Sequence, residues 1–277
     1  MIICRTAHEL QSYRQTQHGE IGLVPTMGFL HHGHLALVRE SNHNCDVTIV
    51  SIFVNPTQFG PTEDLNKYPR NEKRDIDLLQ NADVNAVFLP STSEMYPCGF
   101  NTWIEVKGIT EVLEGLSRPG HFRGVATVCH KLFNLIQPTQ AYFGQKDAQQ
   151  VSVIKKMVND LGLNVKIGVV PTVRENDGLA MSSRNIYMTA NERDAATILY
   201  KALRKAQELY ETGERNAKVI QSLVANTLYS EPMARIDYVE LVDIQNLQQI
   251  EHIESSVLVA IAVYIGKTRL IDNLCLG

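Results

Sequence analysis

The sequence predicts an α/β fold, in which a doubly wound parallel sheet is followed by a smaller α+β domain. Three observations lead to this prediction. Short apolar runs alternate with segments of helical periodicity through residues 1–174. These runs are almost continuously hydrophobic, as strands buried on both faces are. In residues 175–277, by contrast, helical segments precede several apolar runs, which is the order of an α+β domain.

The first predicted domain, residues 1–174, is built from apolar runs that end at glycine, proline or polar residues. The expected strands are Ile21–Pro25, Val47–Val54, Ala86–Leu89, Ala141–Phe143 and Val165–Val170. The expected helices are His34–Asn42, Asn71–Gln80, Gly124–Ile136 and Asp147–Leu161. Parallel strands require crossover connections, which are normally right-handed, so this alternation predicts a Rossmann-like sheet covered on both faces.

The second predicted domain, residues 175–277, begins with a long amphipathic helix over Thr189–Tyr210. Thr189 is its expected N-cap, and Glu192 is the partner in a capping box. The remaining elements are expected to be a helix and three strands: Asn216–Leu228, Ile236–Val242, Val257–Tyr264 and Thr268–Leu274.

The composition excludes several broad classes of function. The chain has 277 residues, 44% hydrophobic and 20% charged, with a net charge of −4. A negative balance disfavours nucleic acid as a partner. No apolar run reaches the roughly 18 residues of a membrane helix, and no leader peptide is expected. The five cysteines are odd in number and form no CxxC pair, which fits a reducing cytoplasm.

The most informative motif is PTMGFLHHGH, which lies where a strand gives way to a helix. Ligands bind outside the carboxyl ends of parallel strands, and a helix N-terminus preceded by glycines favours phosphate. His31 and His34 would lie on one face of the first helical turn, where they could bind a triphosphate. The alternatives are a surface histidine pair or a zinc site, although zinc usually needs three or four protein ligands.

A second strand ends in FVNPTQF, which places Asn55 and Gln58 at the same edge of the sheet. Their amides could fix a carboxylate or a hydroxyl group without adding charge. The alternative is turn chemistry, because Asn-Pro commonly starts a turn.

A third strand–helix junction reads FGQKDAQQ, with Lys146 near a helix N-terminus. A lysine is a poor partner for the positive end of a helix unless an anion lies between them. Gln150 is expected one turn further on, and Asp147 could simply be an N-cap.

The fourth motif is MSSRN, in which two hydroxyl groups and Arg184 could clamp phosphate oxygens. The alternative is a solvated loop with a structural arginine. Arg118 and His121 could likewise serve anion binding or be solvated surface. Asp75 and Asp77 could lie near a phosphate-bound Mg²⁺, but such residues more often form the wet face of a helix.

Together these motifs, with YPR and RPGHFRGV between them, resemble the pantothenate synthetase family, the pantoate–β-alanine ligases, over essentially the whole chain. HHGH resembles the HIGH signature, and MSSRN the KMSKS-type loop, of the wider nucleotidylyltransferase group. The resemblance implies that pantoate and ATP form pantoyl adenylate, which reacts with β-alanine to give pantothenate. It also implies Mg²⁺ and a homodimer. Because an acyl adenylate is water-sensitive, the site must close, and the second domain, which carries MSSRN at its near edge, could act as the lid.

The resemblance assigns roles residue by residue. His34, His31 and Lys146 are expected to be catalytic, and Gln58, Gln150 and Asn55 to bind pantoate or border the β-alanine site. The residues expected to bind ATP are Met27, Gly28, Phe29, Leu30, His31, His32, Gly33, His34, Gly144, Gln145, Lys146, Asp147, Val173, Met181, Ser182, Ser183 and Arg184. Gln145 departs from the family, which commonly has Glu there, and is expected to act through its backbone.

Two other functions are compatible with some of these motifs. A nucleotidylyltransferase acting on a small phosphorylated alcohol shares HHGH but does not explain the uncharged pair Gln58 and Gln150. A nucleotide-binding regulator without turnover does not explain why Lys146 accompanies the two histidines. Pantoate-dependent pyrophosphate exchange separates these functions from the ligase.

Overall fold

The computed structural model describes residues 1–61 and 63–277, and these form two compact units. The first unit comprises residues 1–144 and 153–171. The second comprises residues 145–152 and 172–277, so the first helical turn after residue 147 belongs to it.

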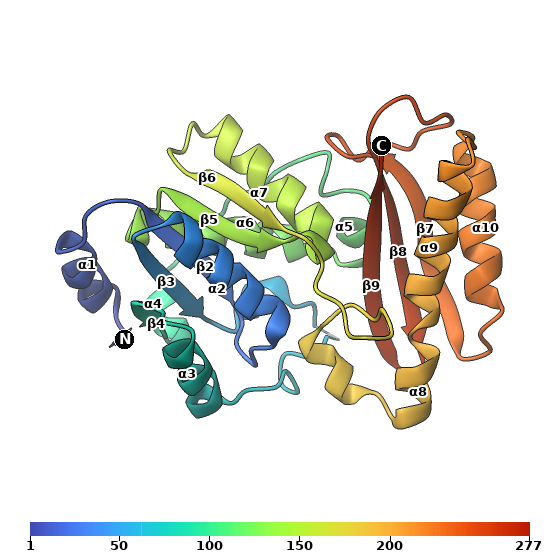
Figure 1. Cartoon of the computed structure of the whole chain (residues 1–277). Coiled ribbons are helices and arrows are strands. Elements are labelled where there is room, and N and C mark those ends of the chain that lie inside the picture. Colours follow the sequence, from blue (N-terminus) through green and yellow to red (C-terminus); the bar gives the residue numbers. More distant parts are fainter. Residues whose placement is uncertain (62) are drawn as a thin grey trace. The chain divides into compact units, whose positions relative to one another are not determined.

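Six parallel strands form the sheet of the first unit, in the order β1-β4-β3-β2-β5-β6 (Figure 1). Their bounds are β1 Ile2–Cys4, β2 Ile21–Thr26, β3 Val47–Ile52, β4 Ala86–Phe88, β5 Gln140–Gly144 and β6 Lys166–Val170. The parallel sheet expected from the sequence is therefore confirmed. β1 is an additional edge strand that the sequence interpretation lacked, because three residues are too few for a periodic pattern.

Helices cover both faces of this sheet. Their bounds are α1 Ala7–Gln15, α2 His32–Asn44, α3 Glu72–Asn81, α4 Thr92–Met95, α5 Glu114–Ser117, α6 His121–Ile136 and α7 Ala148–Asp160. α2 and α3 share one apolar core with the sheet, in which Leu37 and Leu79 pack against Val24, Val50 and Val87. α1 and α6 contact one another, and right-handed crossovers place them on the opposite face.

The second unit contains an antiparallel sheet with strand order β7-β8-β9. Its strands are β7 Ala234–Asp243, β8 Val257–Ile265 and β9 Thr268–Leu276. Its helices are α8 Ala190–Ala195, α9 Ile198–Glu211 and α10 Ala217–Tyr229. One apolar core joins α9, α10 and the sheet, with Leu203 and Ile220 fully buried in it. This agrees with the α+β pattern expected from the sequence.

The single helix expected over Thr189–Tyr210 is wrong, because the chain breaks it into α8 and α9. The capping box of Thr189 and Glu192 is confirmed at the start of α8. At the break, the amide and the hydroxyl group of Thr197 both donate to the carbonyl of Asp194, at 3.2 and 2.8 Å. Bonding to the third preceding residue tightens the turn and interrupts the α-helical ladder.

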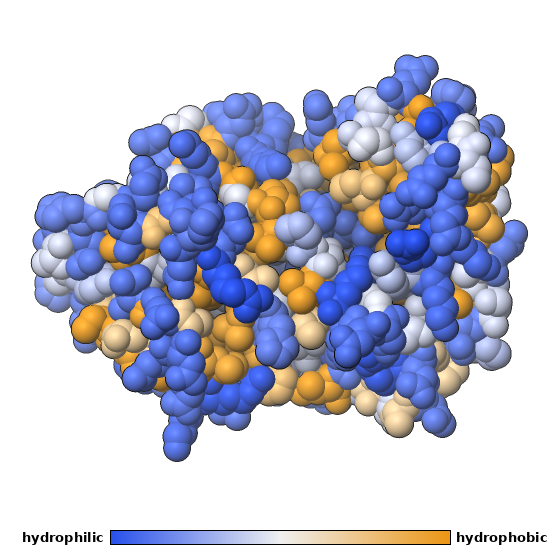
Figure 2. Space-filling model, viewed as in Figure 1, coloured by the Kyte–Doolittle hydropathy of each residue, from blue (hydrophilic) through white to orange (hydrophobic). Residues whose placement is uncertain are grey.

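The visible surface is mostly hydrophilic, with apolar residues in small groups (Figure 2). No helix in residues 1–61 and 63–277 has the length and apolarity needed to cross a bilayer.

Candidate active site

The loop after β2 is held in place by a side chain from α3. Gly28 adopts a φ of 82°, and a Cβ there would lie 2.9 Å from Cγ2 of Ile52. The two carboxylate oxygens of Asp75 accept hydrogen bonds from the amides of Phe29 and Leu30, at 2.7 and 2.8 Å. Glycine is therefore required for the turn, and Asp75 fixes the segment that follows it.

The expectation that Asp75 lies on the wet face of its helix is wrong, and its position near a phosphate-bound Mg²⁺ stays a prediction. The residue is only 1% exposed, and burial raises the pKa of its carboxyl group, against hydrogen bonds that lower it. Both oxygens are engaged by backbone amides, which leaves the carboxylate a structural acceptor. Asp77, two positions on, is exposed.

His31 and His34 lie together at the start of α2, with ring centroids 4.0 Å apart. His31 precedes the first helical turn and caps it, so the expectation that both lie in that turn is corrected. Nδ1 of His31 accepts the amide of Gly33 at 3.1 Å, and Nδ1 of His34 accepts the amide of His31 at 3.3 Å. A neutral ring whose Nδ1 accepts carries its proton on Nε2, so each ring is a donor at Nε2.

The turn after β3 brings Gln58 to the loop after β2. The turn is a short 3₁₀ helix, η1, over Pro56–Gln58, and Asn55 caps it. Nδ2 of Asn55 donates to Oε1 of Gln58 at 3.1 Å, and Nε2 of Gln58 donates to Sδ of Met27 at 2.9 Å. Asn55 and Gln58 are both buried. The turn role considered for Asn55 is therefore confirmed, and its role in binding a substrate stays a prediction.

In the second unit, η2 covers Gln145–Asp147 and is held by β9. Nδ2 of Asn273 donates to the carbonyls of Gln145 and Lys146, at 3.0 and 2.8 Å. The side chain of Gln145 in turn donates to Oδ1 of Asn273 at 3.2 Å. The side chain of Gln145 therefore helps to hold η2 against β9, and the role of its backbone in binding ATP stays a prediction. Nζ of Lys146 lies 3.5 Å from Oδ1 of Asp147.

The segment after β6 doubles back on itself, so that the amide of Met181 donates to the carbonyl of Val173 at 3.0 Å. Arg174 anchors this turn through a bidentate ion pair with the buried carboxylate of Asp272, at 2.6 and 2.9 Å. Two expected ATP segments, at Val173 and Met181, therefore lie side by side.

The MSSRN motif leads into a third 3₁₀ helix, η3, over Ser183–Tyr187. The hydroxyl group of Ser182 caps it by accepting the amide of Arg184 at 3.3 Å, and Ser183 is buried. The segment is therefore ordered by its own hydroxyl group.

The remaining expected residues lie where the fold places their segments. Gly144 ends β5, Gln150 is half-buried in the first turn of α7, and Gly33 lies in the first turn of α2. His32 is exposed on that turn. Each unit thus gathers its own set of expected residues, and their convergence around one ligand stays a prediction.

Sequence reasoning missed Asp272 and Asn273, which are adjacent on β9 and hold both segments of the second unit that are expected to bind ATP. Polar residues in an otherwise apolar strand were the available signal, because a buried polar pair needs partners. No group of three or more His, Cys, Asp or Glu side chains that could hold a metal ion occurs within the described ranges 1–61 and 63–277.

Comparison with known proteins identifies the family. The model of the pantoate-beta-alanine ligase family matches residues 2–275. The chain belongs to that family. It is 55% identical to the pantothenate synthetase of Acetivibrio thermocellus over 99% of this chain and 98% of that protein. It is 54% identical to that of Herpetosiphon aurantiacus, over 99% of both chains.

Solved structures of the family agree with this fold. The pantothenate synthetase of Thermus thermophilus superposes with a TM-score of 0.96, at 44% identity over 99% of both chains. The pantoate-beta-alanine ligase of Francisella tularensis, complexed with beta-gamma ATP and beta-alanine, gives 0.82 at 39% identity over 99% of this chain and 97% of that one. The pantoate–β-alanine ligases are enzymes of pantothenate biosynthesis, so the regulator and nucleotidylyltransferase alternatives are not favoured.

Proposed function

We propose that this chain condenses pantoate with β-alanine at the expense of ATP, through a pantoyl adenylate, and releases AMP and pyrophosphate. The observation that carries the proposal is family membership over residues 2–275, with a relative that binds an ATP compound and β-alanine. In the first step a pantoate carboxylate oxygen attacks the α-phosphorus and pyrophosphate leaves. In the second the β-alanine nitrogen attacks the acyl carbon and AMP leaves.

The chemistry requires two anions to lie side by side, and the site residues supply donors and cations that offset their repulsion. Nε2–H of His34 and of His31 would donate to the phosphates, and Lys146 and Arg184 would stabilise charge on the leaving pyrophosphate. Positioning then makes the attack effectively intramolecular. No covalent enzyme nucleophile is required.

Gln58 is proposed to bind pantoate as a hydrogen-bond donor. Its Oε1 is already taken by Asn55, while its Nε2 carries a second N–H beside the one given to Met27. That N–H suits a carboxylate or hydroxyl oxygen of pantoate. Gln150 is proposed to hold pantoate from the other side.

Mg²⁺ is proposed to arrive with ATP. The described residues provide no ready-made cluster of His, Cys, Asp or Glu side chains for a metal ion. Mg²⁺ usually keeps several waters and binds substrate phosphates with few protein ligands. The ion would therefore be held chiefly by the triphosphate, where it would neutralise charge.

We further propose that residues 1–174 bind ATP and pantoate and that residues 175–277 act as a lid over the water-sensitive adenylate. A homodimer in the cytoplasm is proposed from the family resemblance. Crystals with and without ATP test the lid, because identical positions of residues 175–277 in both would contradict it. Sedimentation equilibrium tests the dimer.

Pantoate-dependent exchange of labelled pyrophosphate into ATP tests the function. The expected result is exchange that needs pantoate and Mg²⁺ but not β-alanine, followed by formation of pantothenate and AMP when β-alanine is added. Absence of exchange at high protein concentration with Mg²⁺ present would overturn the proposal.

A further inference from the structure

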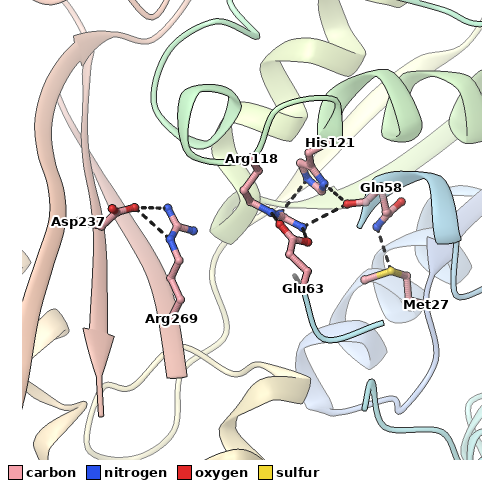
Figure 3. Close-up of polar contacts among 7 residues, drawn as sticks. All are labelled: Met27, Gln58, Glu63, Arg118, His121, Asp237 and Arg269. Carbon is pink, nitrogen blue, oxygen red and sulfur yellow. Dashed lines mark hydrogen bonds and ion pairs between the residues drawn. The ribbon is translucent and has the colours of Figure 1, made fainter. Parts of the chain in front are cut away.

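Three ionisable side chains surround the backbone carbonyl of Gln58 (Figure 3). Nδ1 of His121 lies 2.8 Å from this oxygen, and Nη2 of Arg118 donates to it at 3.3 Å. Glu63 accepts two hydrogen bonds from the Arg118 guanidinium, at 2.7 and 2.8 Å. The carbonyl of Gln58, a proposed substrate-binding residue, is therefore held by the side chains of His121 and Arg118.

The arrangement fixes the state of the imidazole ring. A carbonyl oxygen only accepts and a guanidinium only donates, so Nδ1 of His121 carries a proton while Nε2 accepts from Nη1 of Arg118 at 3.1 Å. A second proton would point at the guanidinium. His121 is thus a neutral bridge between Arg118 and Gln58, with Glu63 balancing the arginine charge.

Arg118 is poorly placed to bind a substrate anion itself. Nε and one N–H of Nη2 go to Glu63, a second N–H of Nη2 goes to Gln58, and one N–H of Nη1 goes to His121. These contacts use most of its five donors. The anion-binding role considered for RPGH from sequence is therefore not the one that the geometry favours.

The turn that carries Gln58 depends on outside support. Its own backbone hydrogen bonds are long, 3.4 Å from the Gln58 amide to Asn55 and 3.3 Å from the Phe59 amide to Pro56. α6 supplies the support: Nδ2 of Asn55 donates to the carbonyl of Gly124 at 3.2 Å. A Cβ at Gly124 would lie 2.4 Å from the carbonyl oxygen of Thr57, so only glycine admits this approach.

The side chain of Gln58 has a determined orientation as well. Oδ1 of Asn55 accepts the Thr57 amide and the hydroxyl groups of Thr57 and Tyr96, at 3.3, 2.9 and 2.9 Å. Nδ2 of Asn55 must therefore be the group that faces Oε1 of Gln58. The Gln58 amide thus presents its NH₂ end to Met27 and to a ligand.

We propose that His121 and Arg118 are positioning residues for pantoate, which act by holding the carbonyl of Gln58 so that its amide NH₂ meets the substrate. The inference rests on the proposed role of Gln58 in binding pantoate. A three-residue helix with long internal bonds would otherwise allow the side chain to move, and a misplaced donor weakens both binding and attack.

Two substitutions of His121 distinguish a positioning role from a purely structural role. In His121→Asn the amide nitrogen takes the place of Nδ1 and retains the donor to Gln58. In His121→Gln the amide lies at the place of Nε2, so contact with Arg118 is retained and the donor to Gln58 is lost. We expect His121→Gln to raise KM for pantoate roughly tenfold and to lower kcat, with KM for ATP within about twofold. His121→Asn should remain within about threefold of the parent in every constant.

Equal behaviour of the two folded variants, or a parallel rise of KM for pantoate and ATP, would overturn the inference. If His121→Gln does not fold, Arg118→Lys replaces it, because lysine can pair with Glu63 but cannot also bridge to His121 and Gln58. That variant should raise KM for pantoate selectively, and a normal KM would count against the proposal.

Gln58→Ala distinguishes this inference from the proposed function. A normal KM for pantoate in Gln58→Ala would refute the substrate role of Gln58 itself. A raised KM there with a normal KM in His121→Gln would refute only the positioning. In the double variant, His121→Gln should add little to Gln58→Ala, since both act through one contact.

Discussion

The two units hold their proposed site residues by different physical means. In the first, the buried carboxylate of Asp75 on α3 accepts two loop amides, and the half-buried side chains of His121, on α6, and Arg118, just before that helix, share one carbonyl. In the second, β9 holds η2 through Asn273, while ion pairs of partly exposed arginines brace the turn after β6.

This difference predicts which perturbations destabilise each unit. A backbone group that loses its buried partner pays a desolvation penalty, whereas a partly exposed ion pair is screened by water and salt. Substitutions and acid should therefore lower the stability of the first unit more than that of the second. Salt should lower chiefly the stability of the second.

The largest effects are expected at the side chains proposed to be catalytic, where the two units should not differ. His34→Ala and Lys146→Ala, one in each unit, should each lower kcat at least about 100-fold, or roughly 3 kcal/mol, because both stabilise charge in the transition state. Steady-state kinetics measures this. His43, exposed in the last turn of the same helix as His34, provides a matched control as His43→Ala. A loss of kcat under tenfold at either residue would contradict a catalytic role for that group.

Acid should weaken the first unit through His121. Burial, with the nearby Arg118 charge, lowers the pKa of this ring from 6.5 to about 4, against opposing effects of the Gln58 carbonyl, Glu63 and Glu114. Between those two values the unfolded chain binds more protons, so stability should fall as pH drops from about 6.5 to 4, by up to about 3 kcal/mol, and should be unaffected above that window. Urea unfolding at several pH values measures it.

His121→Asn removes the titrating ring and should flatten this slope. An unchanged slope in that variant would assign the acid sensitivity to other groups.

Asp75→Asn should cost about 2–3 kcal/mol of unfolding free energy, because an NH₂ group would face one of the two loop amides that the carboxylate now accepts. The same change should raise KM for ATP, since the loop carries the phosphate-binding segment. Asp77→Asn, on the exposed face of the same helix, is the control and should change neither quantity. Equal stability of the two variants would contradict the role assigned to Asp75.

Asn273→Asp should have a smaller effect, about 1–2 kcal/mol, because an acceptor would face the carbonyls of Gln145 and Lys146. We expect KM for ATP to rise severalfold while KM for pantoate stays near its parent value. Asn246→Asp, in an exposed turn, serves as the control. A rise of KM confined to pantoate would contradict the role assigned to Asn273.

The smallest effect is expected at Arg193, which pairs with Glu175 and Asp177 at 2.9 and 2.8 Å. The carboxylates of these pairs are partly exposed, so Arg193→Ala should cost no more than about 1 kcal/mol. Adding about 0.5 M salt, which screens such pairs, should reduce the difference from the parent, as thermal melts would show. A larger loss of stability that does not depend on salt would contradict the difference proposed between the two units.

Much of the architecture was predictable, because its signals are local. The strands of the parallel sheet are apolar runs bounded by turn residues, and the capping box at Thr189 uses a fixed spacing. The break at Thr197 was not predictable, since Ala196 and Thr197 continue the helical pattern. The cause of the break is the hydroxyl group of Thr197, which donates to the carbonyl of Asp194.

The supporting residues of the site were less predictable than the residues that bear its chemistry. Met27, Gln58 and Asn55 were expected at one edge, and the structure joins them by hydrogen bonds. The partners Asp75 and Asn273 are 45 and 128 residues from the groups they hold, Leu30 and Gln145. Only the folded topology brings such residues together, so local spacing carries no sign of them.

The hydrogen bonds that cap α2 also limit what its histidines can do in the second half-reaction. With Nδ1 of each ring occupied and Nε2 protonated, neither His31 nor His34 offers a lone pair to the incoming β-alanine. The ammonium group must lose its proton to water or to a phosphate oxygen before nitrogen can attack the acyl carbon. In the reaction that we propose, deprotonation of the amine therefore falls to a phosphate oxygen or to water rather than to the imidazoles.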